Sequence, residues 1–308
     1  MSEPDTTTAP RVAVIGLGAM GLPMATRLAE DLTVQAFDPD AARLAEAREQ
    51  GVVAAATPRA AAADADVVVL AVRDAAQVEA ALFGVDGAID PAATAAQVVV
   101  LTSTVGRDAA RAVERAVHEA TDGGVGVVDA PVSGGPARAG AGDLLVVVGA
   151  DPQARERARP VLGRLASTLT VVGDRVGDGQ VVKTINQLLA GVHIAAAAEA
   201  IALTRELGLD PEVIVPLLST GAAGSFMLAD RGPRMAQAYT GGAPVRSRVD
   251  IFVKDMGLVT ELARSAHVPT PLAASAQQLY LMAEQAGLGA QDDSSVVTLL
   301  SAPDGGAA

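Results

Sequence analysis

The sequence predicts an α/β fold, in which a mostly parallel sheet covered on both faces is followed by an all-α C-terminal domain. The first half alternates short apolar, β-branched runs with helical segments, and this alternation ends near residue 177. The runs are apolar on both faces, which is typical of parallel strands with helices on either side. The length of 308 residues suggests two domains, at roughly 100–200 residues each.

The amino-acid composition excludes several classes of partner and active site before any motif is considered. The chain has 23 basic and 36 acidic residues, so we expect no nucleic-acid or membrane partner, because those partners require clustered Lys and Arg. It has no Cys, which excludes a thiol nucleophile, and its three His lie far apart, so no metal site is expected. The polar N-terminus lacks the apolar segment of a secretory signal, and we expect a cytoplasmic protein.

The strands and helices of the first half are predicted from their patterns. Val12–Ile15 is a β-branched run that ends at Gly16, and a helical pattern follows over 20–30. Thr33–Phe37 is a second strand, which stops at Asp38, where a charged helix begins. Further strands are expected at the remaining apolar runs: Val67–Val72, Val98–Leu101, Val125–Val128, Leu144–Val148 and Leu169–Val172.

The second half has helical periodicity. Helices are predicted over Val181–Leu207, Val249–Ala266 and Pro271–Ala286. The apolar stretch Leu188–Leu203 is shorter than the ~20 residues of a membrane span, so we expect a buried helix. The first long helix is expected to join the two domains and to line a cleft between them. The predicted divisions are domains at 11–175 and 176–301, and tails at 1–10 and 302–308.

A glycine motif directly follows the first strand. In VAVIGLGAMG, glycines spaced G-x-G-x-x-G permit a tight turn, close approach of a pyrophosphate and close packing of helix on strand. The helix N-terminus adds N–H groups and the positive end of its dipole. Such a turn can be purely structural, but the order strand, motif, helix favours an NAD-binding domain of the Rossmann type. The candidate cofactor-binding residues here are Gly16, Leu17, Gly18, Ala19, Met20 and Gly21.

Asp38 lies about 20 residues after the motif, where an acid binds the ribose hydroxyls of NAD and repels the 2′-phosphate of NADP. Pro39 follows and the nearest base, Arg43, lies a helical turn further, so NAD is expected over NADP. The alternative is that Asp38 only caps the next helix, with Pro39 at its first position. Val72, at the end of a predicted strand, is a further cofactor-binding candidate.

A polar triplet lies on the predicted long helix, in GDGQVVKTINQ. Lys183 is three residues from Asn186 and four from Gln187, so the three side chains share one face. A Lys on a helix rich in Ala, Val and Leu is desolvated, which lowers its pKa and makes it a usable general acid or base. The alternative is a Lys that extends its amine to solvent or pairs with an acid.

Four motifs together give the chain a family resemblance. GLGAMG at 16–21, DAPVSGG at 129–135, GDGQVVKTINQ at 177–187 and FVKD at 252–255 occur in the order found in the β-hydroxyacid dehydrogenase family. The chain resembles this family, which includes 3-hydroxyisobutyrate dehydrogenase and tartronate semialdehyde reductase, from residue 11 to residue 301.

The resemblance implies a role for each matching residue. Lys183 is the general acid/base. The residues that bind the substrate and its carboxylate are Ser133, Gly134, Gly135, Asn186, Gln187 and Lys254. Further cofactor contacts come from Ser103, Thr104 and Lys254.

These roles are physically reasonable, although each residue could instead have a purely structural role. Ser133 and two glycine N–H groups can form a small anion-binding nest, or an ordinary loop. Lys254 adds positive charge that would lower the pKa of a nearby Lys, or it pairs with Asp250 or Asp255. The second Asn that is usual in the family is Gln187 here, which changes the pocket.

Stretches 186–203, 249–259 and 287–297 look like the L-threonate dehydrogenase branch of the family. The resemblance implies NAD-dependent oxidation of a short hydroxy acid, with L-threonate to 2-dehydro-L-erythronate as the leading reaction. The alternative is a 3-hydroxyisobutyrate dehydrogenase or tartronate semialdehyde reductase-type activity, and a remote one is a non-catalytic dinucleotide-sensing module. The apolar second half and the family imply a homodimer or homotetramer. The turn 291–293 is expected to reach substrate, a neighbouring subunit or solvent.

Overall fold

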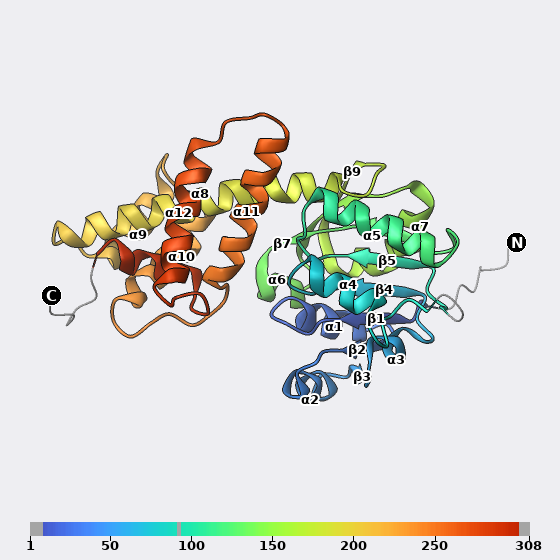
Figure 1. Ribbon diagram of the computed structural model, residues 1–308. Coiled ribbons are helices and arrows are strands. Elements are labelled where there is room, and N and C mark those ends of the chain that lie inside the picture. Colours follow the sequence, from blue (N-terminus) through green and yellow to red (C-terminus); the bar gives the residue numbers. More distant parts are fainter. Residues whose placement is uncertain (1–8, 91–93, 302–308) are drawn as a thin grey trace, which may run out of the picture. The chain divides into compact units, whose positions relative to one another are not determined.

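The computed structural model describes residues 9–90 and 94–301 and divides the chain into two compact units (Figure 1). The first unit ends at Lys183 and the second begins at Thr184, whereas the sequence prediction placed the division at 175. Apart from residues 9 and 10, the predicted tails 1–10 and 302–308 lie outside the described residues. The two units are described separately below.

The first unit is built on one sheet, in which the described residues form nine strands in the order β3-β2-β1-β4-β5-β6-β8-β7, with β9 paired to β8. The six strands from β3 to β6 pair in parallel, β8 runs antiparallel to β6 and β7, and β9 is parallel to β8. The predicted mostly parallel sheet is therefore confirmed. The strands are β1 Val12–Ile15, β2 Val34–Phe37, β3 Val53–Ala54, β4 Val67–Leu70, β5 Val98–Leu101, β6 Gly126–Asp129, β7 Val132–Ser133, β8 Leu144–Gly149 and β9 Ala166–Gly173.

Helices cover both faces of this sheet, as the strands' all-apolar composition predicted. Val12 and Val14 of β1 belong to one buried cluster, whereas Ala13 and Ile15, which alternate with them, belong to the other. The first cluster includes residues of α1 (Gly21–Ala29), α2 (Ala41–Glu49), α6 (Gly135–Gly140) and α7 (Pro152–Leu165). The second includes residues of α3 (Pro58–Ala62), α4 (Ala75–Phe83) and α5 (Arg107–Ala120).

The second unit is helical over its described residues. Helix α8 begins in the first unit and continues into the second. Tyr280 stacks on Phe252 with ring centroids 5.2 Å apart and donates a hydrogen bond to the Gly191 carbonyl at 2.9 Å. A Cβ at Gly191 would lie 2.3 Å from the Met256 sulfur, so a larger residue there would require the Met256 side chain to move. The helices are α8 Asp178–Glu206, α9 Pro211–Thr220, α10 Phe226–Ala238, α11 Val249–Ser265, α12 Pro271–Gln285 and the 3-10 helix η1 Asp293–Leu299.

Helix α8 is, by length and composition alone, apolar enough to cross a membrane. However, 56% of its most apolar window is buried inside the protein, including Ile194 and Ile201 in the core of the second unit. Core helices of soluble proteins pass the same length and hydropathy test. This burial agrees with the helix expected from the sequence.

The acidic turn at 291–293 differs from one of the alternatives predicted for it, exposure to solvent. Asp292 and Asp293 are fully buried and pair with arginines of α10: the Asp292 carboxylate lies 3.0 Å from Arg234 Nε and that of Asp293 lies 2.9 Å from Arg231 Nη2. The prediction of a solvated acidic turn is therefore wrong for both residues. The carboxylates are buried because each has a guanidinium partner on the neighbouring helix, which the sequence spacing does not reveal.

Candidate active site

The glycine motif forms a tight turn between β1 and α1. Gly16 has φ +97°, and a Cβ there would lie 2.6 Å from the Ala71 carbonyl oxygen; a Cβ at Gly21 would lie 1.9 Å from that of Gly16. Both positions therefore require glycine, and α1 packs directly on the end of the strand. At Gly18, by contrast, a Cβ would have only the Arg43 guanidinium nearby, at 4.0 Å. The backbone at Gly18 is open to the approach of a pyrophosphate.

Asp38 ties the end of β2 to this turn. Its buried carboxylate accepts hydrogen bonds from the Leu17 N–H at 2.7 Å and from the Asp40 N–H at 2.9 Å. Helix α2 is capped by Asp40, whose side chain accepts from the Ala42 N–H, so the alternative of Asp38 as the helix cap is wrong. Arg43 Nη1 lies 3.4 Å from Asp38 Oδ2, so this base is closer to the acid than the spacing suggested.

The other cofactor candidates lie where neighbouring strands end. The Val72 N–H, just past β4, donates to Ser103 Oγ at 2.9 Å, and the Ser103 hydroxyl donates to the Leu70 carbonyl at 3.3 Å. Thr104 follows Ser103 in the half-buried part of the loop after β5. Because β1 and β4 are neighbours from which the strand order runs in opposite directions, this carboxyl edge is where such sheets bind dinucleotides. The structure therefore brings the cofactor candidates of the first unit to one edge.

The substrate candidates of the first unit, Ser133, Gly134 and Gly135, link β7 to α6. Gly134 and Gly135 have φ of +146° and +79°, in the left-handed region that favours glycine. A Cβ at Gly135 would meet nothing within 4 Å, so its backbone is open to a ligand. Ser133 is half-buried beside them, and α6 has no side-chain cap at its start. This arrangement fits the predicted nest for a carboxylate.

Lys183 is buried on α8, at the last position of the first unit, and it is engaged in interactions with its surroundings. Asn186 and Gln187 follow on the same helix but belong to the second unit. There the Asn186 amide donates to Gln187 Oε1 at 2.9 Å, and the Gln187 amide donates to Asp255 Oδ2 at 2.5 Å. The two amides are therefore held as one hydrogen-bonded chain.

Lys254 has an acidic partner, as one of the sequence alternatives stated. Its Nζ lies 3.1 Å from Oδ1 of the buried Asp255, while Asp250 pairs with Arg248 instead. Asp255 thus holds both Gln187 and Lys254; the sequence analysis anticipated its pairing with Lys254 but missed its contact with Gln187. The residue was visible in the FVKD motif, but its contact with Gln187 joins residues 68 positions apart.

Two further residues that the sequence analysis missed are Asp129 and Gln180. Asp129 ends β6 and is fully buried; its carboxylate accepts from the N–H groups of Gly177 and Gln180, both at 2.9 Å, and from Gln180 Nε2 at 2.8 Å. Burial raises the pKa of Asp129 to about 6, against the lowering effect of these hydrogen bonds. An Asp that ends an apolar strand, inside a quoted motif, was the available signal.

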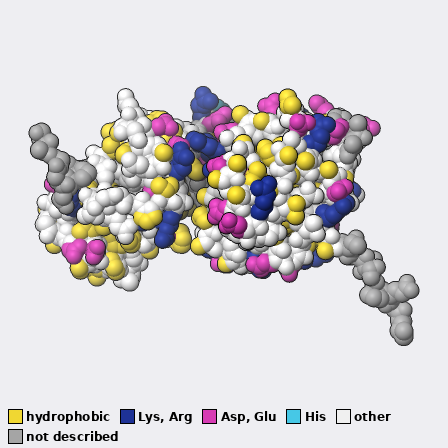
Figure 2. Space-filling model, turned by 90° about the horizontal axis from the view of Figure 1, so that it is seen from below, with side chains coloured by type: hydrophobic (Ala, Val, Ile, Leu, Met, Phe, Trp, Pro, Cys, Tyr) yellow, Lys and Arg dark blue, Asp and Glu magenta, His cyan; other side chains and the backbone are white. Residues whose placement is uncertain are grey.

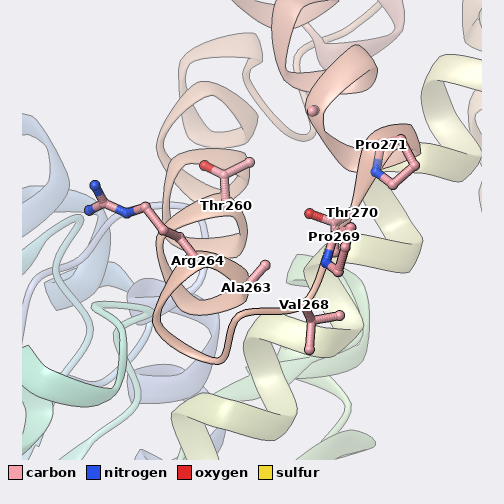
Figure 3. A pocket seen from close by; sticks show the side chains of 8 residues that line it. Thr260, Ala263, Arg264, Val268, Pro269, Thr270 and Pro271 are labelled. Atoms are coloured by element: carbon pink, nitrogen blue, oxygen red, sulfur yellow. The ribbon is translucent and has the colours of Figure 1, made fainter.

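A pocket of about 410 Å³ lies apart from these residues, at the turn between α11 and α12. Figure 3 shows the Arg264 guanidinium directed away from the other labelled residues. None of the predicted site residues lines this pocket, so it does not belong to the candidate active site. Its lining residues are Thr260, Ala263, Arg264, Val268, Pro269, Thr270, Pro271 and Ala274.

Comparison with known proteins finds matches over nearly the whole chain. Residues 11–173 match the NAD-binding domain of 6-phosphogluconate dehydrogenase, and residues 177–300 match the NAD-binding domain of NADP-dependent 3-hydroxyisobutyrate dehydrogenase. L-threonate dehydrogenases of Cupriavidus necator and Pectobacterium atrosepticum are 40% and 39% identical; each match covers 94% of this chain, and 95% and 94% of the respective relative. A crystal structure of 3-hydroxyisobutyrate dehydrogenase from Salmonella typhimurium has a TM-score of 0.85 at 36% identity, covering 94% of this chain and 99% of that one.

Proposed function

Since this chain belongs to the 3-hydroxyisobutyrate dehydrogenase family of NAD-dependent hydroxyacid oxidoreductases, we propose that it oxidises L-threonate to 2-dehydro-L-erythronate. The similarity to several L-threonate dehydrogenases, over 94% of the chain, carries this choice of substrate. Other members of the family act on related acids, so oxidation of 3-hydroxyisobutyrate, or a tartronate semialdehyde reductase-type activity, is the second candidate.

NAD is held, in this proposal, by the turn Gly16–Gly21, with Asp38 at the ribose and with Val72, Ser103, Thr104 and Lys254 as further contacts. The open backbone at Gly18 supports this assignment. Bound NAD supplies the acceptor for the hydride that leaves the substrate carbon. The protein supplies the position of the cofactor and the removal of the hydroxyl proton.

Lys183 is the general base that takes the proton from the substrate hydroxyl as the C–H bond breaks. The substrate carboxylate accepts hydrogen bonds from the Ser133 hydroxyl and the N–H groups of Gly134 and Gly135, and Lys254 adds positive charge. Asn186 and Gln187 orient the remaining hydroxyls. Their mutual hydrogen bond and that of Gln187 to Asp255 support this role, because a fixed amide selects one arrangement of hydroxyls.

The deciding assay is NADH formation with L-threonate, erythronate, glycerate and 3-hydroxyisobutyrate, measured under identical conditions. The highest kcat/KM for L-threonate supports the proposal. A preference for 3-hydroxyisobutyrate overturns the substrate and supports the second candidate. NADH formation with none of the acids, together with tight NAD binding, would instead indicate a dinucleotide-sensing module.

We also propose that the protein is a cytoplasmic homodimer or homotetramer that binds neither nucleic acid nor membranes. Figure 2 gives a view of apolar side chains at the surface of the second unit. The exposed large apolar residues of α8 include Ile185, Leu189 and Leu203, each more than half exposed, and exposed apolar patches mark interaction sites. The net charge of −13 disfavours nucleic acid and anionic membranes as partners. Light scattering of the purified protein measures the copy number.

A further inference from the structure

Asp129 and Gln180 join three segments of the first unit. Besides its bonds to Asp129, Gln180 donates from Nε2 to the Ser103 carbonyl at 3.1 Å, and its Oε1 accepts from the N–H groups of Val105 at 3.0 Å and Gly106 at 3.1 Å. Both polar atoms of the Gln180 side chain are therefore bonded to other segments. The end of β6, the loop after β5 and the first turn of α8 meet at this pair.

We propose that Asp129 and Gln180 are positioning residues, which clamp the turn of α8 that carries Lys183 onto the loop that carries Ser103 and Thr104. This inference rests on the proposed role of Lys183 as general base. Lys183 follows Gln180 by three residues, so the two side chains are neighbours on the same helix face. Ser103, at the other end of the clamp, is a candidate cofactor contact. The clamp therefore sets the base relative to the cofactor loop.

The geometry exceeds what capping α8 requires. A cap needs one side-chain oxygen on an N–H group of the first turn. Here a fully buried carboxylate binds the N–H group of Gln180 in the first turn and that of Gly177 just before the helix, and it also orients a side-chain amide that reaches a separate loop. Gly179 permits the close approach, because a Cβ there would lie 3.0 Å from both the Asp129 and Val147 carbonyl oxygens. A displacement of a catalytic group by about 1 Å can lower the rate about a hundredfold. A clamp that fixes the position of Lys183 would therefore maintain the rate.

The pKa of Asp129 is set by burial and by its hydrogen bonds to Gln180, Gly177 and Gly179, and the segments around it also carry charged residues. They are Arg107 and Arg111 of α5, Arg175 before α8, and Asp178 and Lys183 of α8. Arg111 bonds the Val176 carbonyl and lies 3.8 Å from Asp178, so it is engaged beside the clamp. The raised pKa of Asp129 arises first from burial. Protonation near that pKa removes the negative charge that accepts three hydrogen bonds and loosens the clamp.

The test compares Asp129→Asn and Gln180→Met with Asp151→Asn, a matched control that caps α7 in the same unit. Both clamp variants should lose about tenfold or more in kcat with L-threonate, and KM for NAD should rise by a smaller factor, because the cofactor loop loosens while the glycine turn is untouched. The acid limb of the wild-type kcat–pH profile near pH 6 should be absent in Asp129→Asn. The control should match the wild type in all three measurements.

Amide hydrogen exchange, followed by mass spectrometry, measures how firmly the segments joined by the clamp are held, and it does not depend on the substrate. Peptides over 176–186 and 102–108 should exchange faster in both clamp variants, and one over 16–24 should not. Lys183→Ala should lose activity with unchanged exchange. Wild-type kcat in the clamp variants, or unchanged exchange at 176–186, overturns the proposal. If wild-type protein oxidises none of the acids or Lys183→Ala stays active, the proposed function fails instead, and the exchange pattern decides whether the clamp exists.

Discussion

Replacing Asp129 by Asn should remove a pH-dependent part of the free energy of unfolding. The folded-state pKa of this carboxyl is raised from 3.8 to about 6. A raised pKa means that the contribution to stability is fully present below pH 3.8 and is lost as the pH rises through about 6. The wild type therefore becomes less stable with rising pH on account of Asp129, and Asn, which does not titrate, lacks this trend.

The magnitude follows from the size of the shift. At 1.36 kcal/mol for each pKa unit, moving the pKa from 3.8 to about 6 corresponds to about 3 kcal/mol at high pH. Between pH 5 and pH 8, where the protein is easiest to handle, the linkage relation gives a loss of about 1.4 kcal/mol. This slope is separate from any constant cost of losing a hydrogen bond to Gln180.

Urea unfolding of wild type and Asp129→Asn at intervals across this pH range measures the effect. The quantity of interest is the difference between the two free energies of unfolding, since other titrating groups cancel in it. The wild type should lose about 1.4 kcal/mol relative to the variant as the pH rises. A flat difference, or one that changes in the opposite direction, would show that Asp129 does not have a raised pKa and that the reasoning from its burial is mistaken.

Three further variants test the site. Lys183→Ala should lose about 10²–10⁴-fold in kcat because general acid–base catalysis supplies that factor, with NAD binding by titration calorimetry unchanged; full activity would refute the role. Asp38→Ala frees the Leu17 N–H and removes the carboxylate from the ribose site, so KM for NAD should rise and the preference for NAD over NADP, compared from their KM values, should shrink; a native preference for NADP would contradict the assignment. Asp255→Asn removes the charge paired with Lys254 and disturbs the hydrogen bond to Gln187. In steady-state kinetics, KM for L-threonate should therefore change more than KM for NAD, and equal changes would argue against a role of Asp255 at the substrate.

The elements of the first unit were predictable because their signals are local. The all-apolar runs at Val98–Leu101 and Val12–Ile15 became strands with the expected bounds. The two-residue strands β3 and β7 were missed, because so short a run leaves no alternation to detect. Helix η1 was missed for a different reason. Asp292, which caps it, lies in an acidic turn, and acidic turns suggest solvent exposure rather than the start of a buried helix.

Sequence alone predicted the fold class and the glycine turn, because strand and helix periodicity and the glycine spacing act within a few residues of each other, and the order of four motifs gave the catalytic candidates by resemblance to a family. Only the tertiary structure decided which partner each buried charge takes. Asp129 meets Gln180 across 51 positions, and Gln187 meets Asp255 across 68. A buried carboxylate must find hydrogen-bond donors, but the packing of strands and helices determines which donors are within reach.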